Sequence, residues 1–297
     1  MTNAEAPELV RIETPHGTFW TRENDFVTAQ LRDFGGHQRS ELGMLLSFVR
    51  EGDVVCDIGA HIGTFSIPLA RRVGAGGRVF AFEPVEGSRR ILEKNVEANA
   101  LADRLRIVHA IVTDLPGSYR LHVAGDHTSA AHFSLGGGAE SGPPGPPSVR
   151  LDDWAGSAGV ALTRLDVVKI DTEGMELRAL RSAASLLRTH RPVIMAEMSG
   201  AHLARHGDTI AAVGSFLAQF GYRFFRNLGE RHARTEAFAL ERLLSPAHGS
   251  QFFDLVAVHP TSDRFPEASR GPWLPLVHYL GRRARGLAAG VRRRLPG

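Results

Sequence analysis

An alternation of short apolar runs with helical patterns, between Asp53 and Val258, limits most strongly what this chain can fold into. The runs have the length and the Val, Ile and Phe content of strands. Their apolar character is continuous, as expected when helices cover both faces of a sheet. The pattern predicts an α/β fold with a mostly parallel, seven-stranded sheet and helices on both faces. The predicted strands are DVVCDI, RVFAFE, RIVHAIV, DVVKID, PVIMAEM, YRFFR and FFDLVAVH.

Three regions are expected along the chain. Residues 1–50 form an N-terminal extension with a hairpin around Pro15-His16-Gly17 and a helix, 51–262 form the core, and 263–297 form a basic tail. Within the core, a Gly/Pro-rich insertion at about 125–148 is expected to be mobile, either as a plain connector or as a loop that covers the substrate. Helical periodicity predicts helices at about Gln38–Val49, Thr64–Val73, Ser88–Asn99, Glu173–Thr189 and Thr209–Phe220.

Composition points to a cytoplasmic protein. The single cysteine, Cys56, cannot form an intrachain disulfide and is expected to be a small core residue. The N-terminus lacks the pattern of a secretory signal, and no apolar stretch approaches the ~18 residues of a transmembrane helix.

Basic charge is concentrated in the tail. From Ala268 onward there are seven arginines and no acid, whereas the preceding residues carry 28 basic and 32 acidic side chains. A uniformly basic nucleic-acid-binding surface is therefore not predicted. Apolar residues at near-helical spacing between the arginines are typical of a basic amphipathic helix on an anionic membrane, with a frayed, solvated tail as the alternative. The oligomeric state cannot be derived from these patterns.

The loop after the first predicted strand reads Asp57-Ile58-Gly59-Ala60-His61-Ile62-Gly63. It lacks the middle glycine of the dinucleotide fingerprint, and it has no Gly-Lys-Ser/Thr for phosphate binding. An acid beside the loop would repel phosphate but could accept hydrogen bonds from an amine. The loop therefore favours a ligand that approaches the backbone closely and is not held through phosphates.

An acid also ends the second predicted strand. Glu83 follows the glycines by about 20 residues, where doubly wound sheets place the acid that binds ribose hydroxyls. A carboxylate that accepts from both the 2′ and 3′ hydroxyls recognises a ribose well. Together with the loop, Glu83 predicts a cofactor that contains adenosine and is not held by a pyrophosphate.

The stretches DVVCDIGAHIGTF, VFAFEP, KIDTEGMELRALRSA and RPVIMAE together resemble the FkbM family of class I S-adenosylmethionine-dependent methyltransferases. The resemblance runs from about Thr14 to Glu197 and implies a Rossmann-like class I methyltransferase fold with S-adenosyl-L-methionine as cofactor. The family usually has asparagine where this chain has His61, which could alter contacts with the amino-acid end of the cofactor; a solvent-facing residue at the helix start is the alternative. The cofactor-binding residues that the resemblance implies are Asp57, Gly59, Ala60, His61 and Gly63 at the methionine end, Glu83 at the ribose, and Ala110 and Ile111 at the adenine.

Candidate catalytic residues follow the fourth predicted strand. Lys169 and Asp171 point the same way because side chains alternate along a strand, and they lie at the sheet edge where ligands bind. Asp171 is the first candidate for a base or an orienting group, and Glu173 is the second unless it caps a helix. Lys169 could orient either acid or form a buried structural pair. Two close acids, which Glu197 could join, could also hold a divalent cation through oxygen ligands, but two are too few to assert a metal site, and a metal is the minority interpretation.

We therefore expect an S-adenosylmethionine-dependent methyltransferase that acts on a hydroxyl of a sugar, a polyketide or another secondary metabolite. The Asn/Asp-Pro-Pro-aromatic motif of enzymes that methylate exocyclic base amines is missing from the sequence after the fourth predicted strand, so nucleic acid is not an expected partner. Two alternatives stay open: a binding protein that keeps the fold without turnover, and a nicotinamide-dependent oxidoreductase, which the missing glycine disfavours.

Overall fold

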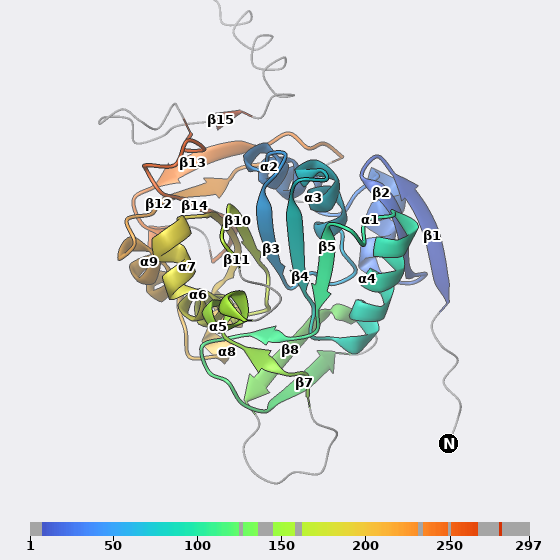
Figure 1. Ribbon diagram of the computed structural model, residues 1–297, viewed down its shortest axis with the longest axis horizontal. Helices are drawn as coiled ribbons and strands as arrows, with labels where there is room; N and C mark the ends of the chain where they lie inside the picture. The colour runs from blue at the N-terminus through green and yellow to red at the C-terminus, as the bar shows by residue number, and fades with distance from the viewer. Residues whose placement is uncertain are drawn as a thin grey trace, which may run out of the picture.

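A single nine-stranded sheet forms the centre of the molecule (Figure 1). The computed structural model describes residues 8–124, 127–135, 145–157, 162–230, 234–248, 251–266 and 279–280. In spatial order the strands are β15 (Tyr279–Leu280), β13 (Ala239–Leu243), β12 (Arg223–Asn227), β14 (Phe252–Val258), β11 (Val193–Ser199), β10 (Val167–Ile170), β3 (Val54–Ile58), β4 (Arg78–Phe82) and β5 (Leu105–Val108).

The α/β fold with a mostly parallel sheet is confirmed. Strands β11, β10, β3, β4 and β5 pair in parallel, while β14, β12, β13 and β15 pair antiparallel beyond β11. Six of the seven predicted strands and the first half of the third lie in this sheet, and β13 and β15 extend it to nine. The helical pattern expected over the tail is wrong at Tyr279 and Leu280, because their backbone pairs with β13 at the edge of the sheet. The rest of the tail, 267–278 and 281–297, lies outside the described residues.

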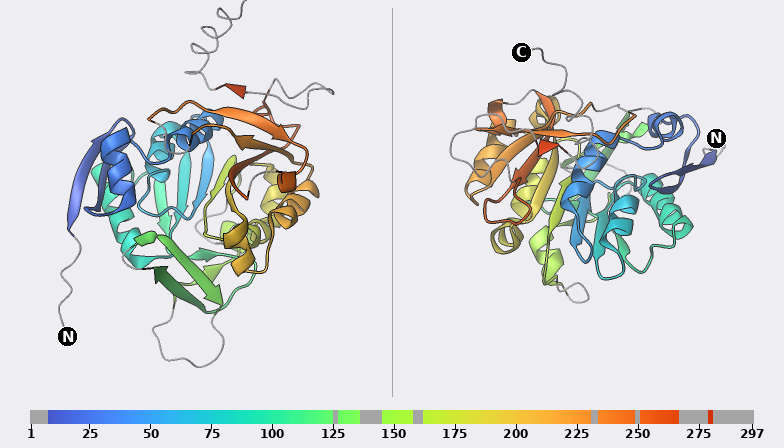
Figure 2. Two further views of the ribbon diagram at one scale, coloured as in Figure 1. Left: turned by 180° about the vertical axis from the view of Figure 1, so that it is seen from behind. Right: turned by 90° about the horizontal axis from the view of Figure 1, so that it is seen from above.

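Two apolar cores lie on opposite faces of the sheet, as the alternation of side chains along each strand requires. Helices lie on both sides of the sheet (Figure 2). Val55 belongs to the core under the first four helices, whereas its neighbour Cys56 belongs to the core under the later ones. Cys56 is fully buried, which confirms it as a small core residue. The helices are α1 (Phe26–Phe34), α2 (Arg39–Phe48), α3 (Ser66–Val73), α4 (Glu86–Ala98), α5 (Leu151–Gly156), α6 (Glu176–Ser182), α7 (Ala184–His190), α8 (Gly200–Arg205) and α9 (Ile210–Ala218), with a 3₁₀ turn at Pro246–His248.

The N-terminal hairpin is anchored to α4. Strands β1 (Leu9–Thr14) and β2 (Gly17–Arg22) pair antiparallel around the predicted turn. The Asn95 side chain accepts a hydrogen bond from the Trp20 backbone N at 2.6 Å and donates one to the Trp20 carbonyl at 3.1 Å. A side-chain amide thus pairs with the strand as a neighbouring strand would.

Among the helices of the described residues, none is long and apolar enough to cross a bilayer.

Three local expectations are wrong. The third predicted strand is broken, because after β5 the chain turns away and β6 (Ile111–Val112) pairs with β9 (Ser148–Val149). The predicted helix at Glu173–Thr189 begins only at Glu176 and is interrupted at Ala183, directly after Ser182, whose Oγ donates back to the Ala179 carbonyl; such back-bonding bends helices. Part of the Gly/Pro-rich insertion is regular, since β8 (His127–Leu135) pairs with β7 (Tyr119–Ala124), while 125–126 and 136–144 lie outside the described residues.

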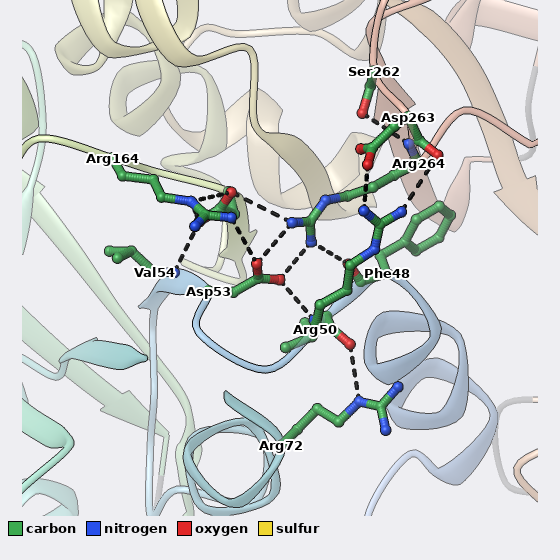
Figure 3. Close-up of polar contacts among 11 residues, drawn as sticks. Phe48, Arg50, Asp53, Val54, Arg72, Arg164, Ser262, Asp263 and Arg264 are labelled. Atoms are coloured by element: carbon green, nitrogen blue, oxygen red, sulfur yellow. Dashed lines mark hydrogen bonds and ion pairs between the residues drawn. The ribbon is translucent and has the colours of Figure 1, made fainter. Parts of the chain in front are cut away.

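A network of hydrogen bonds and ion pairs surrounds Arg264, which follows β14. It lies at the amino ends of β3 and β10, opposite their carboxyl ends (Figure 3). Arg264 binds Asp53 through two parallel hydrogen bonds of 2.5 and 2.7 Å, and its Nη1 also donates to the Phe48 carbonyl. Arg164 contacts the same carboxylate at 3.2 Å, but its side chain is 55% exposed against 8% for Arg264. Phe265 packs its ring against Phe225, so the core continues at least to this residue.

Replacing Arg264 should destabilise the fold far more than replacing Arg164. Arg264→Ala leaves the buried Asp53 carboxylate without its bidentate partner and should lower the free energy of unfolding by about 3–5 kcal/mol. Arg164→Ala removes a solvent-screened contact to the same acid and should cost less than about 1 kcal/mol. Urea denaturation measures both variants. Equal losses would show that Arg264 is no more than a surface contact.

Candidate active site

A cavity of about 230 Å³ opens at the carboxyl ends of β3, β4 and β10. Open parallel sheets bind their ligands at this edge. Three further segments complete the wall: the start of α1 with Phe26, the segment between α1 and α2 with His37 and Gln38, and the strand β8 with Phe133. Among the predicted site residues, those that line the cavity are Gly59, Ala60, His61, Glu83, Ala110, Ile111, Lys169, Asp171 and Glu173; Asp57 and Gly63 do not line it.

The loop after β3 touches the backbone of the loop after β10. Gly59 has a φ of +84°, and a Cβ at this position would lie 1.8 Å from the carbonyl oxygen of Asp171. Only glycine permits this approach. Gly63 has a φ of +91°, and its Cβ would meet the Leu92 side chain at 2.5 Å, so it serves the packing of α4 behind the cavity. Gly59 thus allows the contact of this loop with the loop after β10, and Gly63 allows its contact with α4.

Glu83 is held at the cavity wall by backbone donors. Its Oε2 accepts from the His61 N at 2.6 Å and its Oε1 from the Val85 N at 2.8 Å. Burial raises the pKa of Glu83 to about 7, although both hydrogen bonds act in the opposite direction. Each carboxylate oxygen has a second lone pair, so the group can accept two further hydrogen bonds. This arrangement fits recognition of two adjacent ribose hydroxyls.

His61 lies at the wall of the cavity, not on the open surface. Burial lowers its pKa to about 4, so the imidazole is neutral at neutral pH. Its backbone adopts a φ of +51°, in the left-handed region that asparagine also tolerates well. A neutral ring here offers one donor and one acceptor to whatever occupies the cavity.

Lys169 contacts both the loop after β3 and the loop after β10. Its Nζ donates to the Gly59 carbonyl at 2.9 Å and lies 3.2 Å from Asp57 Oδ1 and 3.7 Å from Asp171 Oδ2. Burial disfavours its charge, but the two neighbouring carboxylates outweigh this and raise its pKa. Asp57 is fully buried and also accepts a hydrogen bond of 2.5 Å from Ser66 Oγ. The structure therefore places the Asp57 side chain behind the loop as the counter-charge of Lys169.

Asp171 and Glu173 both line the cavity but have different surroundings. The Asp171 side chain is 25% exposed and faces the cavity beside Lys169. Glu173 Oε2 lies 2.9 Å from His202 Nδ1. The alternative that Glu173 caps the following helix is wrong, because the N-cap residue of α6 is Met175 and no side chain forms a cap hydrogen bond there. Glu176 instead holds the loop before the helix: its Oε1 accepts from the Thr172 N and Oγ1 and from the Gly174 N at 3.0–3.1 Å.

Sequence reasoning missed several wall residues. Phe26 is the first residue of α1, where no helix was predicted. His37 and Gln38 come from the segment before α2, at the start of a predicted helix, and Phe133 comes from the insertion. The signal for α1 is weak, although Asp25 is a usable N-cap whose carboxylate accepts from the Val27 N at 2.8 Å.

Comparison with known proteins identifies the family. The profile described as "Methyltransferase FkbM domain" matches residues 57–224, more than half of the chain. The chain belongs to the FkbM methyltransferase family. The resemblance seen in the sequence is thus confirmed, and the family implies S-adenosyl-L-methionine as cofactor. Membership also decides against the nicotinamide-dependent alternative.

More distant similarities exist. A probable cobalt-precorrin-6B C(15)-methyltransferase (decarboxylating) of Pyrobaculum calidifontis is 31% identical over 81 residues, 26% of this chain and 42% of the relative's own length. Among solved structures, precorrin-6y C5,15-methyltransferase of Geobacter metallireducens is 16% identical with a TM-score of 0.44 and coverage of 81% and 94%. Methyltransferase FkbM of Methylobacillus flagellatus is 14% identical with a TM-score of 0.41 and coverage of 72% and 48%.

The cavity residues fit this cofactor. Glu83 keeps acceptor capacity for the ribose, Gly59 leaves the backbone of the loop bare, and Ala110 and Ile111 supply an apolar wall for a base. Among the described residues that line the cavity, Lys169 is the only lysine or arginine, and Asp57 and Asp171 already balance its charge. Such a site suits a nucleoside that has no phosphate.

Cofactor binding should depend on the ionisation of Glu83. Ribose hydroxyls donate to the carboxylate, so a proton must leave Glu83 first when the pH lies below its pKa of about 7. The affinity for S-adenosylhomocysteine should therefore weaken by about tenfold from pH 8 to pH 6 and stay nearly constant above pH 8. Calorimetric titration measures this dependence.

In Glu83→Gln the affinity should fall by at least about tenfold at pH 8, and its pH dependence should disappear. Glu86→Gln, an exposed glutamate one turn along the chain, is the matched control and should behave as wild type. A Glu83→Gln variant that keeps the pH dependence would exclude Glu83 as its origin.

Proposed function

We propose that this protein transfers a methyl group from S-adenosylmethionine to a hydroxyl of a small molecule, such as a sugar, a polyketide or another secondary metabolite. The observation that carries the proposal is the Asp171 carboxylate, which is partly exposed in the cavity while Lys169 lies 3.7 Å behind it. A carboxylate in this place can accept a hydrogen bond from an acceptor hydroxyl and orient its oxygen.

When bound, the cofactor supplies an electrophilic methyl group on a sulfonium. Glu83 holds the ribose hydroxyls, and the loop from Gly59 to His61 borders the amino-acid end. Asp171 orients the acceptor hydroxyl and takes its proton, a contribution typically worth about 10²–10⁴-fold in rate. Lys169 Nζ, 3.7 Å from Asp171 Oδ2, orients this carboxylate toward the acceptor. Alignment of the two reactants by these side chains can contribute on the order of 7–11 kcal/mol.

The walls of the cavity support a small acceptor of mixed polarity. Phe26, Phe133 and Met175 offer apolar surface, whereas His37 and Gln38 offer polar groups. Gln30 orients these two, since its Oε1 contacts His37 Nδ1 at 2.6 Å and accepts from the Gln38 N at 3.3 Å. The described residues that line the cavity include no arginine, which supports a small molecule over nucleic acid.

Acceptor screening by mass spectrometry tests the proposal. The full chain is incubated with S-adenosylmethionine and pools of hydroxylated sugars and polyketides, matched against pools with the hydroxyls blocked. A gain of one CH₂ unit only in the free-hydroxyl pools is expected. Methylation of amines alone would overturn O-methylation, and cofactor binding without any product would favour the binding protein without turnover.

Asp171→Asn should separate catalysis from cofactor binding. The amide keeps the shape of the side chain but cannot take a proton, so kcat should fall by about 10²–10⁴-fold. The affinity for S-adenosylhomocysteine should change by less than about twofold, because Glu83 and the loop after β3 are untouched. Asp103→Asn, at an exposed acid paired with Arg104, is the control. Wild-type turnover in Asp171→Asn would make Asp171 a structural residue.

A further inference from the structure

Three metal-ligating side chains from separate elements converge beside the cavity. Glu173 follows β10, Glu197 lies in β11, and His202 lies in α8. One ligand atom from each lies within 4.8 Å of the other two. Glu173 and Glu197 also line the cavity, so the cluster borders the same space as Asp171.

Backbone packing fixes the position of this cluster. Gly174 has a φ of +114°, and a Cβ there would lie 2.3 Å from the His202 carbonyl oxygen. The glycine therefore lets α8 approach the loop after β10 more closely than any other residue would allow. The residue before it, Glu173, adopts a φ of +55°, an uncommon conformation for a non-glycine residue. Ser199 caps α8 by accepting from the His202 N at 3.3 Å. Close packing of the loop after β10 against α8 thus brings the backbones of Glu173 and His202 near each other.

His202 Nδ1 faces Glu173. The two atoms, His202 Nδ1 and Glu173 Oε2, are 2.9 Å apart, yet among the described residues no hydrogen bond with proper geometry reaches the buried His202 Nδ1. A cation bound beside these two atoms would supply a partner for the His202 Nδ1 lone pair.

The ligand set indicates the class of cation. Two carboxylates and one imidazole give three protein ligands, as in catalytic metal sites that keep positions open for substrate. Ca²⁺ and Mg²⁺ prefer oxygen ligands alone, whereas imidazole suits first-row transition metals. Two carboxylates together carry two negative charges, which favours a divalent over a monovalent ion.

We propose that Glu173, Glu197 and His202 bind a divalent first-row transition metal ion, with its open coordination positions facing the cavity. There the ion would take an oxygen atom of the acceptor and hold it beside Asp171. This role in orienting the acceptor rests on the proposed function, whereas binding of the ion does not.

Direct titration with Mn²⁺ tests the site without any acceptor. The full chain is stripped with a chelator, and free Mn²⁺ is followed by electron paramagnetic resonance together with calorimetry. One ion per chain is expected, displaced stoichiometrically by Zn²⁺. His202→Ala should weaken Mn²⁺ binding by at least about tenfold. His206→Ala, one turn further along the chain, is the matched control and should bind as wild type.

Glu197→Gln provides a second variant and should also weaken Mn²⁺ binding at least about tenfold. Absence of stoichiometric binding of Mn²⁺ and Zn²⁺ to the wild type, or unchanged affinity in a folded His202→Ala or Glu197→Gln, would overturn the site. Failure of the proposed function is separable: Mn²⁺ binding that persists while no hydroxyl acceptor is methylated leaves the metal site in place and removes only its role toward the acceptor. With an acceptor in hand, His202→Ala should raise its KM while the affinity for S-adenosylhomocysteine stays unchanged.

Discussion

The buried ammonium of Lys169 is the interaction on which the site depends. It lies among the Gly59 carbonyl and the carboxylates of Asp57 and Asp171, and so joins the cofactor side of the cavity to the acceptor side. Lys169 pairs directly with Asp57 across the parallel strands β10 and β3. A shift of β10 by one residue would turn Lys169 to the opposite face and leave the Asp57 charge buried without a partner. The pairing register of β10 and β3 therefore also decides whether the charges of Lys169 and Asp57 meet in the site.

Backbone contacts, more than long side chains, give the cavity its shape. The loop after β3 reaches the loop after β10 through Gly59, and that second loop reaches α8 through Gly174. Each contact leaves no room for a Cβ, so the three segments are packed tightly against one another. Preorganisation of this kind lets Glu83, Asp171 and the proposed metal ligands hold their relative positions without a cost in side-chain entropy at the moment of binding.

The ion pair that stabilises the fold and the residues of the candidate active site lie at opposite ends of the strands. At the carboxyl ends of the strands, burial of Glu83 and His61 shifts their pKa values away from the ordinary range, a cost that a binding site tolerates. At the other end, Asp53 is paired bidentately with Arg264, which fixes the segment after β14 to the start of β3. The charged groups there satisfy one another, whereas those at the cavity keep capacity for a ligand.

The sequence by itself determined the α/β class, the approximate places of the strands along the chain, the family, and the placement of Glu83, Lys169 and Asp171 at strand ends, because each depends on local patterns or on the end of a single strand. It could not determine the order of the strands in the sheet, that the Asp57 side chain lies behind the loop, or that His202 meets Glu173, since these facts depend on which segments distant in sequence come into contact. The wall formed by Phe26, His37 and Phe133 and the added strands β13 and β15 likewise required the tertiary structure. Local patterns report what a segment buries, whereas only packing decides which segment it is buried against.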